Sequence, residues 1–140
     1  MSIDEAKTIL HRNRLKATNQ RIALIQYLSE QNSPRPLSAI SKNKQLRMNE
    51  STIFRNLEAF TKANLVNQYL IDSGVTHYEL SLDGNIHHHI VCTNCNTIEE
   101  LQDCPIQDMQ IVLNQTHLFQ KITSHQLCFY GTCTNCANYM

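Results

Sequence analysis

The sequence lacks any long hydrophobic run. No stretch approaches the roughly 20 apolar residues that a membrane-spanning helix needs, and the N-terminus carries no apolar segment typical of a signal peptide. We therefore expect a cytoplasmic protein that does not enter the membrane. Without an export signal, the six cysteines would lie in a reducing compartment, where metal binding is a commoner role for them than disulfide formation.

Net charge is also lacking, since 12 Lys and Arg balance 12 Asp and Glu. This balance hides two opposite parts. Residues 1–64 carry eleven basic against five acidic side chains, whereas residues 65–140 carry one against seven. Six of the seven histidines and all six cysteines lie in the second part. The division predicts a basic N-terminal part that contacts phosphate and an acidic, ligand-rich C-terminal part that binds cations.

Two C-x2-C motifs are the strongest signal in the chain. Cys92 and Cys95 form the first motif, and Cys133 and Cys136 form the second. Together they can supply four thiolates to one zinc ion in tetrahedral geometry. A chain of 140 residues forms one domain or two small ones, and a structural metal would help to stabilise small domains.

Three consecutive histidines, His87, His88 and His89, lead into the first motif. If a β-strand runs through them, side chains alternate, so His87 and His89 share one face and could bind the same metal. His88 would then need partners on the opposite face. Glu79, on an earlier strand, could reach a metal near His87 and His89. A solvated polar run is the alternative interpretation.

Apolar periodicity predicts the elements of the basic part. The expected helices cover 3–11, a segment from the N-cap Thr18 onward, a short stretch anchored by Leu37, Ile40 and Leu46, and 49–60. The expected strands cover 65–71 and 75–80, joined by a turn at Asp72-Ser73-Gly74. Helices followed by a hairpin predict a winged helix-turn-helix domain.

The helix expected at 49–60 has the composition of a DNA-recognition helix. Ile53, Leu57 and Phe60 share one face for burial. The opposite face carries Ser51, Thr52, Arg55 and Asn56. Short polar side chains with one Arg can enter a major groove and contact phosphate and base edges. An ordinary solvated helix face is the alternative.

A second domain is expected after a turn at Asp83-Gly84-Asn85. It would contain the histidine-rich strand, a strand at 98–101, a helix from Pro105 whose Ile106, Met109, Val112 and Leu113 face a core, and a strand at 123–130. The predicted fold is α/β (α+β). The predicted domains are a winged-helix domain over residues 1–82 and a small α/β domain over residues 83–140.

This arrangement resembles the ferric uptake regulator (Fur) superfamily of bacterial metal-dependent transcriptional regulators, across almost the whole chain. The stretches that carry the resemblance are 18–21, 51–57, 87–95 and 124–136. The chain departs from the family at Phe54, where Tyr is common. It also departs at Asn96, where Gly usually follows the first C-x2-C motif, although Asn accepts the same left-handed conformation.

The resemblance implies a homodimer that binds a double-stranded DNA operator, with a dimerisation domain that holds structural zinc on the four cysteines. It implies a second, regulatory divalent metal, zinc or Fe(II), on Glu79, His87, His89 and Glu100. The family's iron-type site adds a histidine at the position of Pro36. The DNA-binding positions implied by the matching stretches are Arg21, Ser51, Thr52, Phe54, Arg55 and Asn56.

A third family site would use His88 and His125. An acidic residue expected there is replaced by Gln107, so that Asp103, Cys104 or Asp108 would have to substitute for it.

The function we predict is that of a metal-responsive repressor, with zinc rather than iron as the sensed metal because nitrogen-rich ligand sets favour zinc. One alternative is a zinc hydrolase, but H-E-x-x-H does not occur and four cysteines would leave zinc no open position. Another is a zinc-ribbon module that binds a protein partner through the acidic part. We therefore predict that the protein is not an enzyme.

Overall fold

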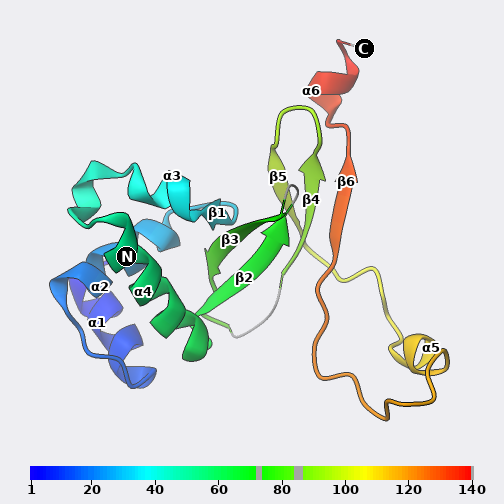
Figure 1. Ribbon diagram of the computed structural model, residues 1–140, viewed down its shortest axis with the longest axis horizontal. Helices are drawn as coiled ribbons and strands as arrows, with labels where there is room; N and C mark the ends of the chain where they lie inside the picture. The colour runs from blue at the N-terminus through cyan, green and yellow to red at the C-terminus, as the bar shows by residue number, and fades with distance from the viewer. Residues whose placement is uncertain (72–73, 84–86, 140) are drawn as a thin grey trace. The chain divides into compact units, whose positions relative to one another are not determined.

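The computed structural model describes residues 1–71, 74–83 and 87–139, and the chain divides into two compact units, Met1–Asn85 and Ile86–Met140 (Figure 1). The elements of the first unit are α1 (Ile3–Arg12), α2 (Asn19–Ser29), β1 (Arg35–Pro36), α3 (Leu37–Ser41), the 3-10 helix η1 (Lys44–Leu46), α4 (Glu50–Lys62), β2 (Val66–Ile71) and β3 (Val75–Leu80). Those of the second are β4 (His88–Cys92), β5 (Ile98–Leu101), α5 (Gln110–Leu113), β6 (Cys128–Gly131) and α6 (Thr134–Ala137).

Two turns predicted between these elements fall partly outside the described residues. They are Asp72-Ser73-Gly74, of which Gly74 is described, and Asp83-Gly84-Asn85, of which Asp83 is described. The domain boundary predicted after residue 82 stays a prediction.

Side-chain caps fix where the helices of the first unit begin. Ser2 and Glu5 form a reciprocal capping box at α1. The hydroxyl of Thr18 accepts a hydrogen bond from the Arg21 N–H at 3.2 Å, which confirms the predicted N-cap of α2. At α4 the side chain of Asn49 accepts from the Thr52 N–H at 2.8 Å. Each cap satisfies a backbone donor that would otherwise lack a partner at the helix start.

The core of the first unit joins all its helices to its sheet. Leu10 of α1, Ile25 of α2 and Ile40 of α3 are fully buried. From α4 the buried residues are Ile53, Leu57 and Phe60, the three predicted from their spacing. The short helix predicted from Leu37 to Leu46 is instead divided into α3 and η1, and Leu46 is buried from η1.

A three-stranded antiparallel sheet, ordered β1-β3-β2, completes the first unit. The β2–β3 hairpin pairs continuously from Val66 opposite Leu80 to Ile71 opposite Val75. Leu65, Val66 and Tyr78 pack into the helical core. Leu70 lies on the same face of β2 as Val66, but it stands near the hairpin end of the strand and is 63% exposed. The predicted helical domain with a hairpin wing is confirmed.

The second unit is built on a three-stranded sheet, ordered β5-β4-β6. β4 pairs with β5 in antiparallel register, with His89 opposite Glu100. It pairs with β6 in parallel register, with His89 opposite Cys128. The histidine-rich strand is therefore the central strand of its sheet, and the predicted α/β organisation of this part is confirmed.

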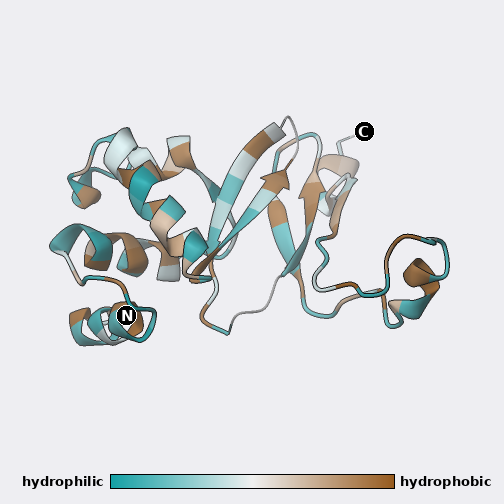
Figure 2. Cartoon of the chain, turned by 60° about the horizontal axis from the view of Figure 1, so that its bottom comes forward, coloured by the Kyte–Doolittle hydropathy of each residue, from teal (hydrophilic) through white to brown (hydrophobic). Residues whose placement is uncertain are grey.

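The helix predicted from Pro105 is wrong. Regular helix covers only α5, a short helix that carries hydrophobic residues, brown in Figure 2. Val112, predicted to face a core, is 42% exposed. Side chains compete with helix formation before α5, because the Gln107 amide donates to the Cys104 carbonyl at 2.8 Å and Asp108 accepts from the Gln110 N–H at 2.9 Å. Of the four residues predicted to face a core, Val112 is exposed and Ile106, Met109 and Leu113 are only half-buried.

The strand predicted over 123–130 is too long at its N-terminal end. Regular strand begins at Cys128, and the parallel register places that residue beside His89. By this register Leu127 lies opposite His88, the first residue of β4, so the residues before Leu127 have no partner in β4. Register therefore limits β6, although alternating side chains suggested a longer strand.

Among the described helices, none is long and apolar enough to cross a membrane.

Replacing Leu57 by Ala tests the core of the first unit. Leu57 is fully buried, so its truncation should lower the free energy of unfolding by about 2–5 kcal/mol. Urea unfolding followed by circular dichroism measures this change. The matched control is Leu70→Ala near the hairpin end of β2, where the side chain is 63% exposed, and it should change stability by less than about 0.5 kcal/mol. Equal losses in the two variants would contradict this core assignment.

Candidate functional site

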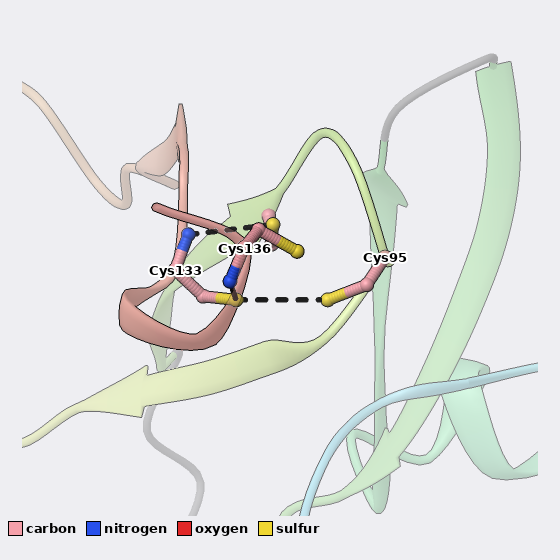
Figure 3. A group of neighbouring side chains, drawn as sticks. Cys95, Cys133 and Cys136 are labelled. Carbon is pink, nitrogen blue, oxygen red and sulfur yellow. Dashed lines mark hydrogen bonds between the residues drawn. The ribbon is translucent and has the colours of Figure 1, made fainter. Parts of the chain in front are cut away.

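The structure gathers the four predicted cysteines at one end of the second sheet. Cys92 ends β4 and Cys95 lies in the turn before β5, whereas Cys133 precedes α6 and Cys136 lies within it (Figure 3). One Sγ atom from each residue lies within 4.8 Å of the other three. The Cys95 and Cys133 sulfurs are 3.7 Å apart. Two ligands of a tetrahedral zinc ion with bonds of about 2.3 Å would be separated by about 3.8 Å.

Backbone conformation and backbone hydrogen bonds fix the two C-x2-C turns that form this cluster. Asn96 adopts the left-handed conformation with φ 62°, as predicted from its place after the first motif, and its N–H donates to the Cys92 carbonyl at 2.9 Å. In the second motif, the Cys136 N–H donates to the Cys133 sulfur at 3.4 Å. The Cys133 N–H donates to the Cys92 sulfur, also at 3.4 Å, and so links the two motifs.

These hydrogen bonds shift the pKa values of Cys92 and Cys136 in opposite directions. The Cys133 N–H, followed by that of Cys95, lowers the pKa of Cys92 to about 6. Hydrogen bonding with the Cys133 side chain, followed by that with Cys95, raises the pKa of Cys136 to about 12. At neutral pH and without metal, the cluster thus holds both a thiolate and a thiol. A set of four sulfur donors at this spacing fits one tetrahedral zinc ion, which would hold all four as thiolates.

A second ligand cluster lies in the same unit and contains His88, Cys104 and His125, with one ligand atom of each within 4.8 Å of the others. His88 belongs to β4, whereas Cys104 follows β5 and His125 precedes β6. The sequence predicts that His88 and His125 share a site and offers three candidates for the third ligand. The structure brings Cys104 to them, while Asp103 and Asp108 are exposed. Cys104 is identified by its contact with His125, which is 21 residues away in the sequence, and no local motif predicts it.

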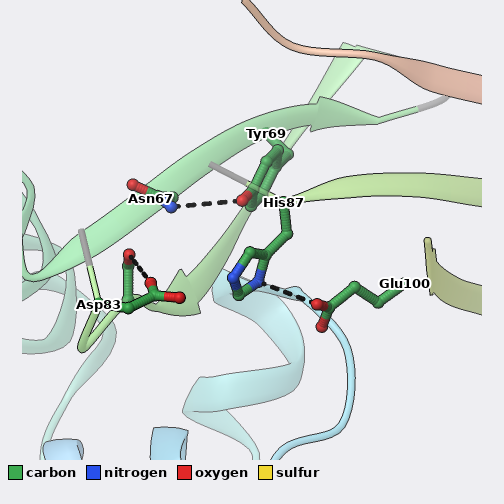
Figure 4. A network of polar contacts seen from close by, with 6 residues as sticks. Asn67, Tyr69, Asp83, His87 and Glu100 are labelled. Carbon is green, nitrogen blue, oxygen red and sulfur yellow. Dashed lines mark hydrogen bonds and ion pairs between the residues drawn. The ribbon is translucent and has the colours of Figure 1, made fainter. Parts of the chain in front are cut away.

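Two of the predicted regulatory ligands meet within the second unit. His87 Nδ1 and Glu100 Oε1 are 3.4 Å apart, with side chains 25% and 33% exposed (Figure 4). His89 is buried on β4, directly opposite Glu100. Glu79 lies in the first unit, half-buried on β3 opposite Asn67. Its association with the other three stays a prediction.

The predicted DNA-binding residues occupy α4 and the start of α2. Ser51, Phe54 and Arg55 are exposed on α4, with Phe54 39% exposed. The Arg21 Nε–H donates to the Asn56 Oδ1 at 3.1 Å and so joins α2 to α4, and the contact of these two residues with DNA stays a prediction. The exposed face of α4 thus offers one cation and one aromatic ring, while Arg21 and Asn56 orient the helix.

Comparison with known proteins places these features in a family. The sequence matches the ferric uptake regulator family over residues 12–130. It is 33% identical to the ferric uptake regulation protein of Bacillus subtilis over 141 aligned residues, covering 96% of this chain and 93% of that protein.

Two solved structures share the fold. The crystal structure of the Vibrio cholerae ferric uptake regulator superimposes with a TM-score of 0.70 at 26% identity, covering 91% of this chain and 98% of that chain. A zinc uptake regulator complexed with zinc and DNA superimposes with a TM-score of 0.67 at 16% identity, covering 98% and 93%. At that identity the second likeness concerns the fold alone.

Zinc bound by the four cysteines should be lost as the pH falls. Zinc has to displace the proton of Cys136 at neutral pH, and below about pH 6 it has to displace that of Cys92 as well. Each displaced proton weakens apparent zinc affinity by about tenfold per pH unit, so the pH dependence should steepen below about pH 6. Competition with a zinc chelator across this range measures the slope. A constant slope through pH 6 would contradict these thiol assignments.

Proposed function

The chain belongs to the ferric uptake regulator family of metal-responsive DNA-binding regulators, and on that premise we propose that it is a zinc-responsive repressor acting inside the cell. The observation that carries zinc over iron is the pair of imidazoles on His87 and His89 without the further histidine of an iron-type site. Imidazole nitrogen suits zinc, whereas an iron-type site would add a histidine where this chain has Pro36.

Members of this family are transcription regulators and not enzymes, so the hydrolase alternative is wrong. The B. subtilis relative is named for ferric uptake, and one protein of the same fold was solved with zinc and DNA. Ferrous iron is therefore the second candidate for the sensed metal, favoured by the carboxylate of Glu100 beside His87.

The regulatory ligands that we propose are Glu79, His87, His89 and Glu100. A divalent ion would supply a positive charge that these neutral imidazoles and carboxylates share. Since the four residues come from both parts of the chain, they would all bind the ion only in some arrangements of those parts. Metal occupancy would then favour the arrangement in which the protein binds its operator.

We further propose that the protein acts as a homodimer formed through its second part. Several large apolar side chains there are exposed in the single chain, among them Ile111 at 63%, Phe119 at 69% and Leu118 at 89%. Exposed apolar groups of this size are typical of surfaces that another protein covers. Two copies would present two α4 helices to successive major grooves of an operator with two half-sites.

Replacing His89 by Ala tests the regulatory site. The variant should lose at least tenfold of the zinc-dependent gain in DNA affinity, because it lacks one proposed ligand. The probe is a fluorescent duplex that the wild-type protein selects from a randomised library in the presence of zinc, and binding is followed by anisotropy. His117→Ala, which changes an exposed histidine, is the matched control and should retain the full gain. A full zinc response in the His89 variant would remove His89 from the sensor.

Replacing Arg55 by Ala tests the DNA-binding face. If Arg55 contacts a phosphate, the variant should bind the same duplex more weakly, and the slope of log affinity against log salt should fall by about 1. Lys62→Ala removes the same charge from the other end of α4 and is the matched control. Equal changes in the two variants would mean that Arg55 acts through net charge and makes no specific contact.

A further inference from the structure

Two arginines of the first unit adopt a backbone conformation that disfavours arginine. Among the described residues, four that are not glycine have positive φ, and two of these are Arg14, with φ 58°, and Arg47, with φ 49°. The left-handed conformation brings Cβ close to the backbone carbonyl oxygen, so glycine adopts it most readily, and asparagine and aspartate tolerate it best among the others. Both arginine side chains are exposed, so neither residue is retained for burial in the core.

A comparison within the chain shows what is unusual about Arg14. Helices α1 and α4 end in the same Schellman motif. In α1 the Arg14 N–H donates to the His11 carbonyl at 3.0 Å, and the next N–H, that of Leu15, donates to the Leu10 carbonyl at 2.8 Å. In α4 the left-handed residue is Asn64, whose N–H makes the equivalent bond, also at 3.0 Å. Because the backbone requirement is the same at both positions, the helix end does not explain an arginine at position 14.

Both arginines lie next to α4. Arg47 is two residues before the N-cap of that helix. Arg14 lies in the connection between α1 and α2. This connection is tied to α4 through Arg21, which donates from Nη1 to the Lys16 carbonyl at 3.3 Å and from Nε to the Asn56 Oδ1 at 3.1 Å. One arginine thus precedes the N-terminal end of α4, and the other stands two residues from a carbonyl that is linked to its middle.

The surroundings of both arginines favour an anion. No acidic residue occurs between Glu5 and Glu30 or between Glu30 and Glu50. Neither guanidinium forms a hydrogen bond or an ion pair with another described residue. A guanidinium presents its donors in a fork that matches phosphate oxygens, and phosphate contacts position a protein on DNA without reading its sequence. We propose that Arg14 and Arg47 bind phosphates of the DNA backbone and so fix the position of α4 in the major groove.

These contacts rest on the proposed function, because α4 has to be the helix that enters the groove. In helix-turn-helix proteins the N-terminal residues of that helix contact base edges, so Arg47, just before them, would meet the phosphates that border the groove. Contacts from two separate connections constrain the orientation of α4 more than one contact would. Binding to DNA would then offset the conformational cost of two left-handed arginines, since residues in sparsely populated conformations cluster at functional sites.

Replacing each arginine by glycine separates stability from DNA binding. In Arg14→Gly and Arg47→Gly, the urea midpoint of unfolding should rise, because glycine adopts the left-handed conformation without strain. DNA affinity should nevertheless fall by at least about threefold, and the slope of log affinity against log salt should fall by about 1 for each bound copy of the chain. The full-length protein is measured by anisotropy on a fluorescent duplex that the wild type selects with zinc or, under anaerobic conditions, with ferrous iron.

Two matched variants control for the backbone and for the charge. Asn64→Gly makes the same backbone change at the equivalent position of α4 without loss of charge, so its unfolding midpoint should rise while its DNA affinity stays unchanged. Lys62→Ala removes a charge from the other end of α4 and should change the affinity less than either arginine variant. A duplex of the same bases in scrambled order should lose affinity for the glycine variants by the same factor, because phosphate contacts do not depend on sequence.

Four results would overturn these contacts. Unchanged affinity and salt slope in both glycine variants would mean that neither arginine touches DNA. A lower unfolding midpoint with unchanged affinity would mean that the arginines serve only the dipoles of the helix ends. An affinity loss confined to the selected duplex would make them base contacts, and a loss no greater than that of Lys62→Ala would make them contributors to net charge alone.

Lysine variants guard against misfolding of the glycine variants. Arg14→Lys and Arg47→Lys keep both the charge and the conformational cost, so they should retain the salt slope of the wild type, and a slope as low as that expected for glycine would contradict phosphate contact. The proposed function fails differently, since it is wrong if zinc does not strengthen DNA binding by the wild type. The salt slope of the arginine variants is then compared with ferrous iron or without metal, and still decides whether Arg14 and Arg47 bind phosphate.

Discussion

The second unit depends on the coordination of its four cysteines, because it has almost no apolar core of its own. Among residues 87–139, the buried apolar side chains are Val91 and Cys92, whereas sixteen are buried among the described residues of the first unit. Hydrophobic burial on that scale cannot offset the conformational entropy of more than fifty ordered residues. A tetrahedral metal that ties the β4–β5 turn to the start of α6 would supply the missing stability, and the partner of a homodimer would cover more of the apolar surface.

Sequence patterns predicted the first unit well because local and tertiary preferences agree there. Thr18 caps α2 as expected, and the spacing of Ile53, Leu57 and Phe60 matches the buried face of α4. The second unit was predicted less well. Whether its segments form helices or strands depends on the other segments that they pack against or pair with, and sequence periodicity does not reveal these. No residue of the apolar stripe after Pro105 is buried, and regular strand in β6 begins only at Cys128. Periodicity identifies a face, but only a packing surface makes that face a helix or a strand.

The same contrast holds for the candidate sites. The C-x2-C spacing identified the four-cysteine cluster because two short motifs carry all its ligands, and the left-handed Asn96 followed from its place after the first motif. Cys104 could be named only as one of three candidates. Cys104 and His125 are 21 residues apart in the sequence, and no strand pairing links the segment between them, so no local sequence pattern predicts their contact. The approach of Glu79 to the histidines depends on both parts of the chain and remains a prediction.

The two clusters of the second unit share strand β4. This shared strand bears on the order in which the clusters would bind metal. His88 begins β4 and Cys92 ends it, so the strand that presents His88 is held at its far end by the four cysteines. Four thiolates enclose their ion, whereas two imidazoles and a thiolate leave one position open for exchange. An exchangeable site can report metal concentration only if its ligands are already in place. If both clusters bind metal, the closed cluster would therefore be filled first and would keep its zinc while the open one loads and empties.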